Sequence, residues 1–149
     1  MYCYSFEIVL QEVPGEISLC FTISGCPLRC EGCHSPFLWK EGLGEKLTFK
    51  HFVETLNKYR GLASCVLFMG GEWHSKHLIR LLKYARSTGY ETCLYSGENK
   101  VDRDILQHLT WIKTGRWNSK LGGLNSPNTN QQFIELETNK KLNHLFIKN

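Results

Sequence analysis

The chain has 149 residues, of which 42% are apolar, and this is enough to bury one hydrophobic core. Its 18 basic and 14 acidic residues are scattered and leave a formal charge of +4, so no run of like charges marks a surface for nucleic acid. No apolar segment is long enough to cross a membrane. We therefore expect a single domain over residues 1–149 that binds neither nucleic acid nor a membrane.

The N-terminal segment MYCYSFEIVLQEVPGE lacks the basic start and the apolar stretch of a secretory signal. Seven cysteines without such a signal predict a reducing, cytoplasmic location, where clustered thiols usually bind metal or react. Four of the cysteines lie in apolar or alternating segments and are expected to be small buried side chains, namely Cys3, Cys20, Cys65 and Cys93.

Predicted strands and helices alternate along the chain. Residues 3–10 and 18–24 are expected to be strands that pair through a turn at 13–15. Thr48 is expected to cap a helix that Gly61 ends, and Ser75 is expected to cap a second helix that ends at 88–89. The remaining predicted elements are strands at 64–69, 90–95 and 111–114 and a weaker helix at 102–109.

This order predicts an α/β fold with a mostly parallel sheet and helices packed on it. In such a sheet the segments that follow the strands meet at one edge, where ligands bind. Those segments are the cysteine loop, GGEW at 70–73, SGE at 96–98 and GRW at 115–117. The chain is too short for an eightfold barrel, which needs about 250 residues, so we expect a reduced, open partial barrel.

The cysteine loop holds Cys26, Cys30 and Cys33 with the spacing C-x3-C-x2-C. Three thiolates leave one position of a metal centre open. Zinc bound by these cysteines and His34 is one interpretation, although structural zinc sites usually draw their ligands from two separate segments. A 4Fe-4S cluster fits the spacing better, because three cysteines on a tight loop can each reach a different iron.

Together with the Gly70-Gly71-Glu72 sequence after the next strand, this spacing resembles the radical S-adenosylmethionine (SAM) superfamily. Within it, the segments VPGEISLCFTISGCPLRCEGCHSPFLW and IKTGRWNSKLGGLNSPNTNQQF resemble the small activating proteins of anaerobic ribonucleoside-triphosphate reductase. This resemblance extends over residues 13–133. It implies that the open partial barrel is of the radical-SAM type.

The resemblance also implies a reaction. Cys26, Cys30 and Cys33 would bind three irons of a 4Fe-4S cluster, and the fourth iron would bind the amino and carboxylate groups of SAM. One electron would release methionine and a 5′-deoxyadenosyl radical, which would take a hydrogen atom from a glycine in a loop of the anaerobic ribonucleotide reductase large subunit. An external one-electron donor such as flavodoxin is implied as well, since the sequence contains no flavin or second-cluster motif.

The resemblance gives roles to the glycine-containing turns. Gly70 and Gly71 would let the main chain approach the methionine end of SAM, and Glu72 would accept a hydrogen bond from its amino group. Ser96 and Gly97 would lie close to the ribose.

The adenine side of the site is defined by fewer residues. Gly32 stands where many superfamily members carry an aromatic side chain against adenine, which leaves His34, Phe37 or Trp39 as candidates for that role. The polar segment 125–132 is expected to be an ordered loop that covers SAM or meets the reductase. Two other functions stay open, namely a radical SAM enzyme for a small molecule, such as a 7-carboxy-7-deazaguanine synthase, and a non-catalytic metal-binding module.

Overall fold

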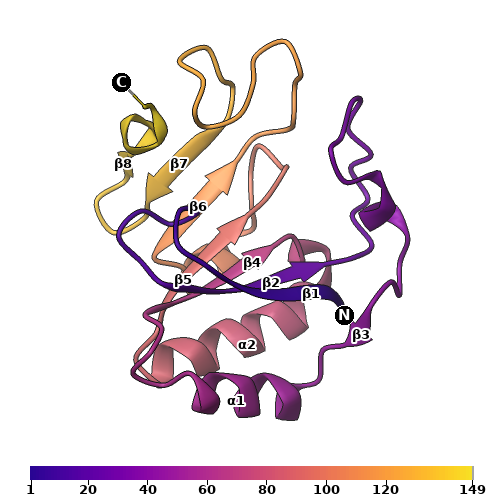
Figure 1. Cartoon of the computed structure of the whole chain (residues 1–149), viewed down its shortest axis with the longest axis vertical. Coiled ribbons are helices and arrows are strands. Elements are labelled where there is room, and N and C mark those ends of the chain that lie inside the picture. The colour runs from indigo at the N-terminus through magenta and orange to yellow at the C-terminus, as the bar shows by residue number, and fades with distance from the viewer. Residues whose placement is uncertain (149) are drawn as a thin grey trace.

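The computed structural model describes residues 1–148 and shows one eight-stranded sheet with helices on one face (Figure 1). The strands are β1 Tyr2–Val9, β2 Ser18–Ile23, β3 Glu45–Lys46, β4 Cys65–Met69, β5 Glu91–Tyr95, β6 Trp111–Thr114, β7 Gln132–Glu135 and β8 Lys140–Lys141. The α-helices are α1 Phe49–Lys58, α2 Ser75–Ser87 and α3 Arg103–Leu106, and short 3-10 helices are η1 Pro36–Trp39, η2 Glu72–His74 and η3 Asn143–Phe146.

The strands follow the order β3-β1-β2-β4-β5-β6-β7-β8 across the sheet. The four central strands, β2, β4, β5 and β6, are parallel, and every pairing outside them is antiparallel. The predicted α/β class, the parallel centre and the pairing of β1 with β2 are therefore confirmed, while the antiparallel strands β3, β7 and β8 were not predicted. The sheet is open, since β3 and β8 end it on opposite sides.

Helices α1, α2 and α3 cover the same face of the sheet, and α1 and α2 lie next to each other beneath it in Figure 1. Their apolar positions face the strands, as the periodicity predicts, because Phe52 and Leu56 of α1 are buried against Phe21 and Phe68. The same holds for α2, whose buried positions are Leu78, Leu81, Leu82 and Ala85.

The two long helices begin differently. The Thr48 side chain accepts a hydrogen bond from the main-chain N–H of His51 at 3.1 Å, so the predicted cap of α1 is confirmed. The predicted cap of α2 is wrong. Ser75 is already the first helical residue, and His74 precedes it without a side-chain hydrogen bond, because the 3-10 turn at Glu72–His74 leads the chain straight into the helix.

A second, smaller apolar cluster lies on the face of the sheet that α1–α3 leave uncovered. It consists of Val13, Cys20, Cys65, Leu67, Cys93, Leu124 and Phe133. Segments without α-helix cover it, including the C-terminal turn, where Phe146 packs on Phe133 with ring centroids 5.0 Å apart. Three of the four cysteines predicted to be buried are buried here, whereas Cys3 is half-buried in β1.

Strand β3 touches β1 only at its start, through the pairs Tyr2–Lys46 and Cys3–Glu45. Gly44 allows this close crossing, since a Cβ atom there would lie 2.1 Å from the carbonyl oxygen of Cys3. Among residues 1–148, no helix is both long and apolar enough to span a lipid bilayer.

Candidate metal centre

Four loops meet at the edge where the parallel strands end. Because β2, β4, β5 and β6 are neighbours and run in the same direction, the segments after Ile23, Met69, Tyr95 and Thr114 all leave the sheet there. The cysteine loop that follows β2 rises at this edge in Figure 1, as do the turns after the other strands. The segments singled out from the sequence therefore lie along one edge.

The cysteine loop is closed on itself by main-chain hydrogen bonds. The N–H groups of Gly25 and Cys26 both donate to the carbonyl oxygen of Leu38, at 2.7 and 3.0 Å, which joins the start of the loop to η1. Within it, Cys33 N–H donates to the Cys30 carbonyl at 3.1 Å. Positive φ angles at Arg29 (48°) and Gly32 (70°) wind the chain between the cysteines, and glycine at position 32 suits its left-handed conformation.

Cys26, Cys30 and Cys33 are half-buried, free thiols. The Ser35 main-chain N–H donates to the Cys33 sulfur at 3.4 Å. Burial raises the pKa of the Cys26 thiol, and the negative charges of Glu72 and of the other two thiolates add to the increase. A metal would have to displace the protons of these thiols, and no fourth cysteine lies in the loop.

Within residues 1–148, no three His, Cys, Asp or Glu side chains are placed to hold one metal ion. A zinc ion needs its ligands at about 2.0–2.3 Å from a single point. In an iron–sulfur cluster each thiolate binds its own iron. His34, the candidate fourth zinc ligand, packs on Trp117 instead, with ring centroids 4.4 Å apart.

Glu72 and Ser96 come together across two neighbouring loops. The Ser96 hydroxyl donates to Oε1 of Glu72 at 2.6 Å and accepts a hydrogen bond from the Glu98 main-chain N–H at 3.0 Å. Oε2 of Glu72 is buried and has no partner among the described residues. Burial raises the pKa of this carboxyl group, while the Ser96 bond opposes the increase. Glu72 thus keeps one free acceptor atom for a ligand.

The glycines predicted to contact SAM also have structural reasons to be glycine. Gly70 and Gly71 have φ angles of 80° and 108°, and a Cβ atom on Gly70 would lie 2.7 Å from the Trp73 ring. A Cβ atom on Gly97 would lie 2.4 Å from Cδ1 of Leu28, in the cysteine loop. These φ angles and contacts account for glycine at the three positions whether or not a ligand binds there.

The cysteine loop contacts the turns that follow β5 and β6. Besides the Leu28–Gly97 contact, the Arg116 guanidinium donates to the Leu28 carbonyl at 3.3 Å. Trp117 follows on the same turn and packs on His34. Its indole Nε1 is buried without a hydrogen-bond partner among residues 1–148, as is Nε1 of Trp73. All the predicted site residues thus lie on the loops that follow the parallel strands.

Lys113 is a residue of this edge that the sequence analysis missed. It is half-buried in β6, and its ammonium group donates to the carbonyl oxygens of Ser96 at 3.4 Å and Gly115 at 3.1 Å. Burial lowers its pKa from 10.5 to about 8, although the negative charges of Cys30 and Glu72 oppose that change. The only signal in the sequence was a lone lysine inside the strand segment WIKT.

The segment 125–132, expected to be an ordered loop, is held by hydrogen bonds to its surroundings. Thr129 donates to the Gly122 carbonyl at 2.9 Å, and the Asn130 amide donates to the Arg116 carbonyl at 2.9 Å. Gln131 is buried and donates to the carbonyl of Gly115 at 3.4 Å. This loop borders a cavity of about 340 Å³ on the helix-free face, lined also by Tyr95 and Lys113.

A protein-family model described as "4Fe-4S single cluster domain" matches residues 13–107, which include the three loop cysteines, Glu72 and Ser96. The pyruvate formate-lyase-activating enzyme of Clostridium pasteurianum is 31% identical over 91 residues. That alignment covers 57% of this chain and 38% of the enzyme, so the chain spans well under half of that relative's length. No solved structure matches the chain.

Proposed function

Because the chain belongs to the 4Fe-4S single cluster domain family, we propose that it is a radical SAM enzyme whose cluster is held by Cys26, Cys30 and Cys33. The observation that carries this proposal is a loop with three free thiols and no fourth, located where four parallel strands end. The other four cysteines lie within β1, β2, β4 and β5, outside the loop. The open sheet is then the partial barrel of a radical SAM protein.

When bound, the cluster supplies one electron that cleaves SAM into methionine and a 5′-deoxyadenosyl radical, and this radical takes a hydrogen atom from a glycine of the substrate. The chain's own residues bind and orient SAM. Oε2 of Glu72, buried and without a partner in the described part of the chain, accepts a hydrogen bond from the SAM amino group. Ser96 holds the other carboxylate oxygen and so fixes the orientation of Glu72.

The glycines shape the main chain beside this carboxylate. Gly70 and Gly71 have positive φ angles and carry no side chain, and their main-chain atoms contact the methionine end of SAM. Gly97 places a main-chain segment next to Ser96 and the ribose, under Leu28 of the cysteine loop. Gly32 and His34 lie on the adenine side, where the Trp117 ring, which packs on His34, adds an aromatic surface.

The proposed substrate is the glycine-bearing loop of the anaerobic ribonucleotide reductase large subunit. Two observations support it. The relative from Clostridium pasteurianum is named as an activating enzyme, and the segment 112–133 resembles the activating proteins of anaerobic ribonucleoside-triphosphate reductase. This segment lies beyond the family match and forms β6 and the loop after it, beside the cysteine loop. A flavodoxin-like protein would deliver the electron in the cytoplasm.

The test is a reconstitution under anaerobic conditions. The chain is loaded with iron and sulfide, reduced, and mixed with SAM and the reductase, and we expect 5′-deoxyadenosine together with a glycyl radical in the electron paramagnetic resonance (EPR) spectrum. Cys30→Ala should reduce both signals to background, because it removes one iron ligand. Cys65→Ala is the matched control and should retain both, because Cys65 is buried in β4.

Two outcomes would overturn the proposal. One equivalent of zinc and no iron after anaerobic purification would indicate a non-catalytic metal-binding module. Formation of 5′-deoxyadenosine with a modified small molecule, but without a radical on the reductase, would instead indicate a radical SAM enzyme of the 7-carboxy-7-deazaguanine synthase kind.

A further inference from the structure

Two tryptophan side chains at the edge of the metal centre each bury an N–H group that has no acceptor. Within residues 1–148, five side-chain polar atoms are buried without a hydrogen-bond partner, and three of them lie at this edge, namely Oε2 of Glu72 and the Nε1 atoms of Trp73 and Trp117. The other two, in Ser18 and His108, lie near the opposite edge, where β2 and β6 begin. Buried donors without an acceptor are rare in folded proteins, and an indole N–H can only donate.

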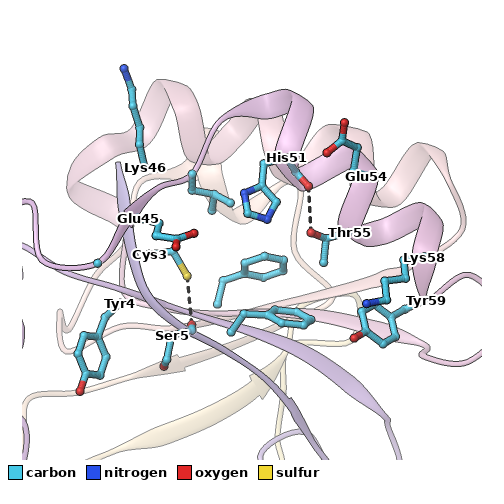
Figure 2. A pocket seen from close by; sticks show the side chains of 14 residues that line it. Cys3, Tyr4, Ser5, Glu45, Lys46, His51, Glu54, Thr55, Lys58 and Tyr59 are labelled. Carbon is cyan, nitrogen blue, oxygen red and sulfur yellow. Dashed lines mark hydrogen bonds between the residues drawn. The ribbon is translucent and has the colours of Figure 1, made fainter.

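The cavity between β1 and helix α1 does not share this property. Its volume is about 500 Å³, and none of the five unpartnered atoms belongs to the residues that line it. Figure 2 shows two of its polar groups in hydrogen bonds, from the Cys3 thiol to the Ser5 carbonyl and from the Thr55 hydroxyl to the His51 carbonyl. The unpartnered indole donors are therefore a feature of the metal centre.

Trp73 lies beside the start of the cysteine loop. Its Nε1 atom is 3.5 Å from the position that a Cβ atom on Gly25 would take, and Gly25 directly precedes Cys26. The other end of the same ring lies against Gly70, where a Cβ atom would be 2.7 Å from it. The ring thus extends from the turn after β4 to the cysteine loop, with its N–H group at the loop.

Trp117 lies beside the end of the same loop. Its Nε1 atom is 3.8 Å from the position that a Cβ atom on Gly32 would take, and Gly32 directly precedes Cys33. The ring is held by His34, on which it packs with ring centroids 4.4 Å apart. The Cys33 sulfur already accepts a hydrogen bond from the Ser35 main-chain N–H at 3.4 Å, so a sulfur of this loop is open to donors.

The acceptor that these indoles lack is one that the cysteines bring when they bind their cluster. Thiolates and cluster sulfides are anionic acceptors, and Cys26 and Cys33 place them next to the two N–H groups. We propose that Trp73 and Trp117 donate hydrogen bonds to sulfur atoms of the cluster at Cys26 and Cys33, and that these bonds raise its reduction potential. The inference rests on the proposed function, because it requires the cluster.

The effect on the potential follows from charge. One electron from the external donor converts the oxidised cluster to the reduced one and adds a negative charge that the sulfur atoms share. An N–H group stabilises a more negative acceptor more strongly, so hydrogen bonds to the sulfurs favour the reduced state. Because cleavage of SAM needs the reduced state, the two indoles would increase the fraction of the protein that a given electron donor can make ready for the reaction.

The test is a redox titration of the cluster-loaded chain without SAM and without the reductase. Trp73→Phe and Trp117→Phe keep an aromatic ring and remove the N–H group. Each should lower the equilibrium constant for one-electron reduction by roughly threefold to tenfold, which corresponds to a midpoint potential about 28–59 mV lower. Trp111→Phe is the matched control and should keep the wild-type potential, because Trp111 begins β6 at the edge away from the cysteine loop.

A second measurement detects the hydrogen bonds themselves. In a chain whose tryptophans carry a magnetic isotope label at the indole nitrogen, pulsed EPR of the reduced cluster should show coupling to that label. The coupling should be lost in the Trp73→Phe/Trp117→Phe double variant and retained in Trp111→Phe. A change in packing alone would alter the potential without accounting for such a coupling.

Three outcomes would overturn the proposal. They are a wild-type potential in both Trp73→Phe and Trp117→Phe with the iron content unchanged, a labelled wild-type chain without coupling, and a shift that appears only after SAM is added, since the indoles would then bind SAM. If a variant fails to assemble the cluster, the labelled wild-type chain decides, because it needs no substitution.

The inference and the proposed function fail in different ways. The expected potential shifts without a glycyl radical on the reductase would overturn the proposed function alone. An intact cluster that forms the radical but does not respond to the two substitutions would overturn the inference alone. A purified chain that holds zinc and no iron would overturn both.

Discussion

Lys113 lies in an environment that differs strongly from that of a lysine in solution. Two main-chain carbonyls, those of Ser96 and Gly115, receive its ammonium group, and the negative charges of Glu72 and Cys30 act on it. A buried ammonium loses hydration that two neutral acceptors replace only in part. Because of that loss of hydration, the pKa of Lys113 falls to about 8.

From the lowered pKa of Lys113 we predict how the free energy of unfolding changes with pH. Between pH 8 and 10.5 the unfolded chain holds a proton on Lys113 that the folded chain has released, so this group makes unfolding less favourable as the pH rises. Below pH 8 both states are protonated and the cost of burying the charge is fully present. The stability of Lys113→Met relative to wild type should therefore fall by roughly 2–3 kcal/mol from pH 7 to 10.5.

Chemical denaturation of the metal-free chain at several pH values measures this difference. Buried cysteines such as Cys65, whose pKa burial raises to about 12, lose stabilisation as the pH rises, but they do so equally in both chains. Lys120→Met, at an exposed lysine, is the control and should follow the wild-type curve. Parallel curves for Lys113→Met and wild type would contradict the prediction.

At the scale of elements, α1 depends on its own first turn more than α2 does. The Thr48 hydroxyl satisfies one of the main-chain N–H groups that the start of α1 leaves open. Helix α2 has no side-chain cap and continues from a 3-10 turn that Gly71 starts with a φ of 108°. A serine directly before an apolar pattern, as at Ser75, is therefore not enough to locate a cap, because the preceding turn decides where the helix begins.

Thr48→Ala should lower the free energy of unfolding by about 1 kcal/mol, because it leaves the His51 N–H without its partner. The matched control is Thr55→Ala in the same helix. Thr55 is within α1 and donates to the His51 carbonyl at 2.9 Å, and alanine at such a site has the higher helix propensity. Thermal or denaturant unfolding should show a loss for Thr48→Ala and a change within about 0.5 kcal/mol for Thr55→Ala. Equal losses in the two variants would contradict the capping role.

The whole molecule shows which parts of a fold a single sequence can predict. Strand β4 is a continuous apolar segment between turn residues, and its pattern alone predicts a buried strand of a parallel sheet. Strands β3 and β8 are pairs of charged residues, Glu45–Lys46 and Lys140–Lys141, which become strands only because β1 and β7 pair with them. Such strands depend on tertiary contacts and leave no signal in their own residues.

The candidate site also has features that the sequence predicts and features that it does not. The rule that loops after parallel strands converge was sufficient to place the cysteine loop, Glu72 and Ser96 at one edge. The sequence did not predict that Ser96 would bind Glu72, or that the half-buried Lys113 would donate to the Ser96 carbonyl. A long side chain within a strand can reach water or stay inside, and only the packed neighbours decide which it does.

The cysteine loop contacts the segments that follow β5 and β6, and its closest contact there is between Leu28 and Gly97. Leu28 lies over Gly97 so closely that a Cβ atom there would be 2.4 Å from its Cδ1. Arg116, from the turn after β6, donates to the carbonyl of the same leucine. The fit between this side chain and Gly97 is thus one of the contacts that set the position of the three thiols relative to the sheet.

Gly97→Ala should displace Leu28 and lower the free energy of unfolding by about 1 kcal/mol, since overpacking forces the leucine from its rotamer. It should also make the cluster release iron to a chelator faster, because the loop no longer packs on the sheet.

Adding Leu28→Ala removes the clash, so the double variant should be more stable than the sum of the single losses predicts, by at least about 0.5 kcal/mol. In Gly123→Ala, where the nearest atoms are 3.7 Å away, both measurements should stay close to wild type. If the losses of the two single variants simply add in the double variant, the methyl group added at position 97 does not clash with Leu28. Other contacts would then hold the loop on the sheet.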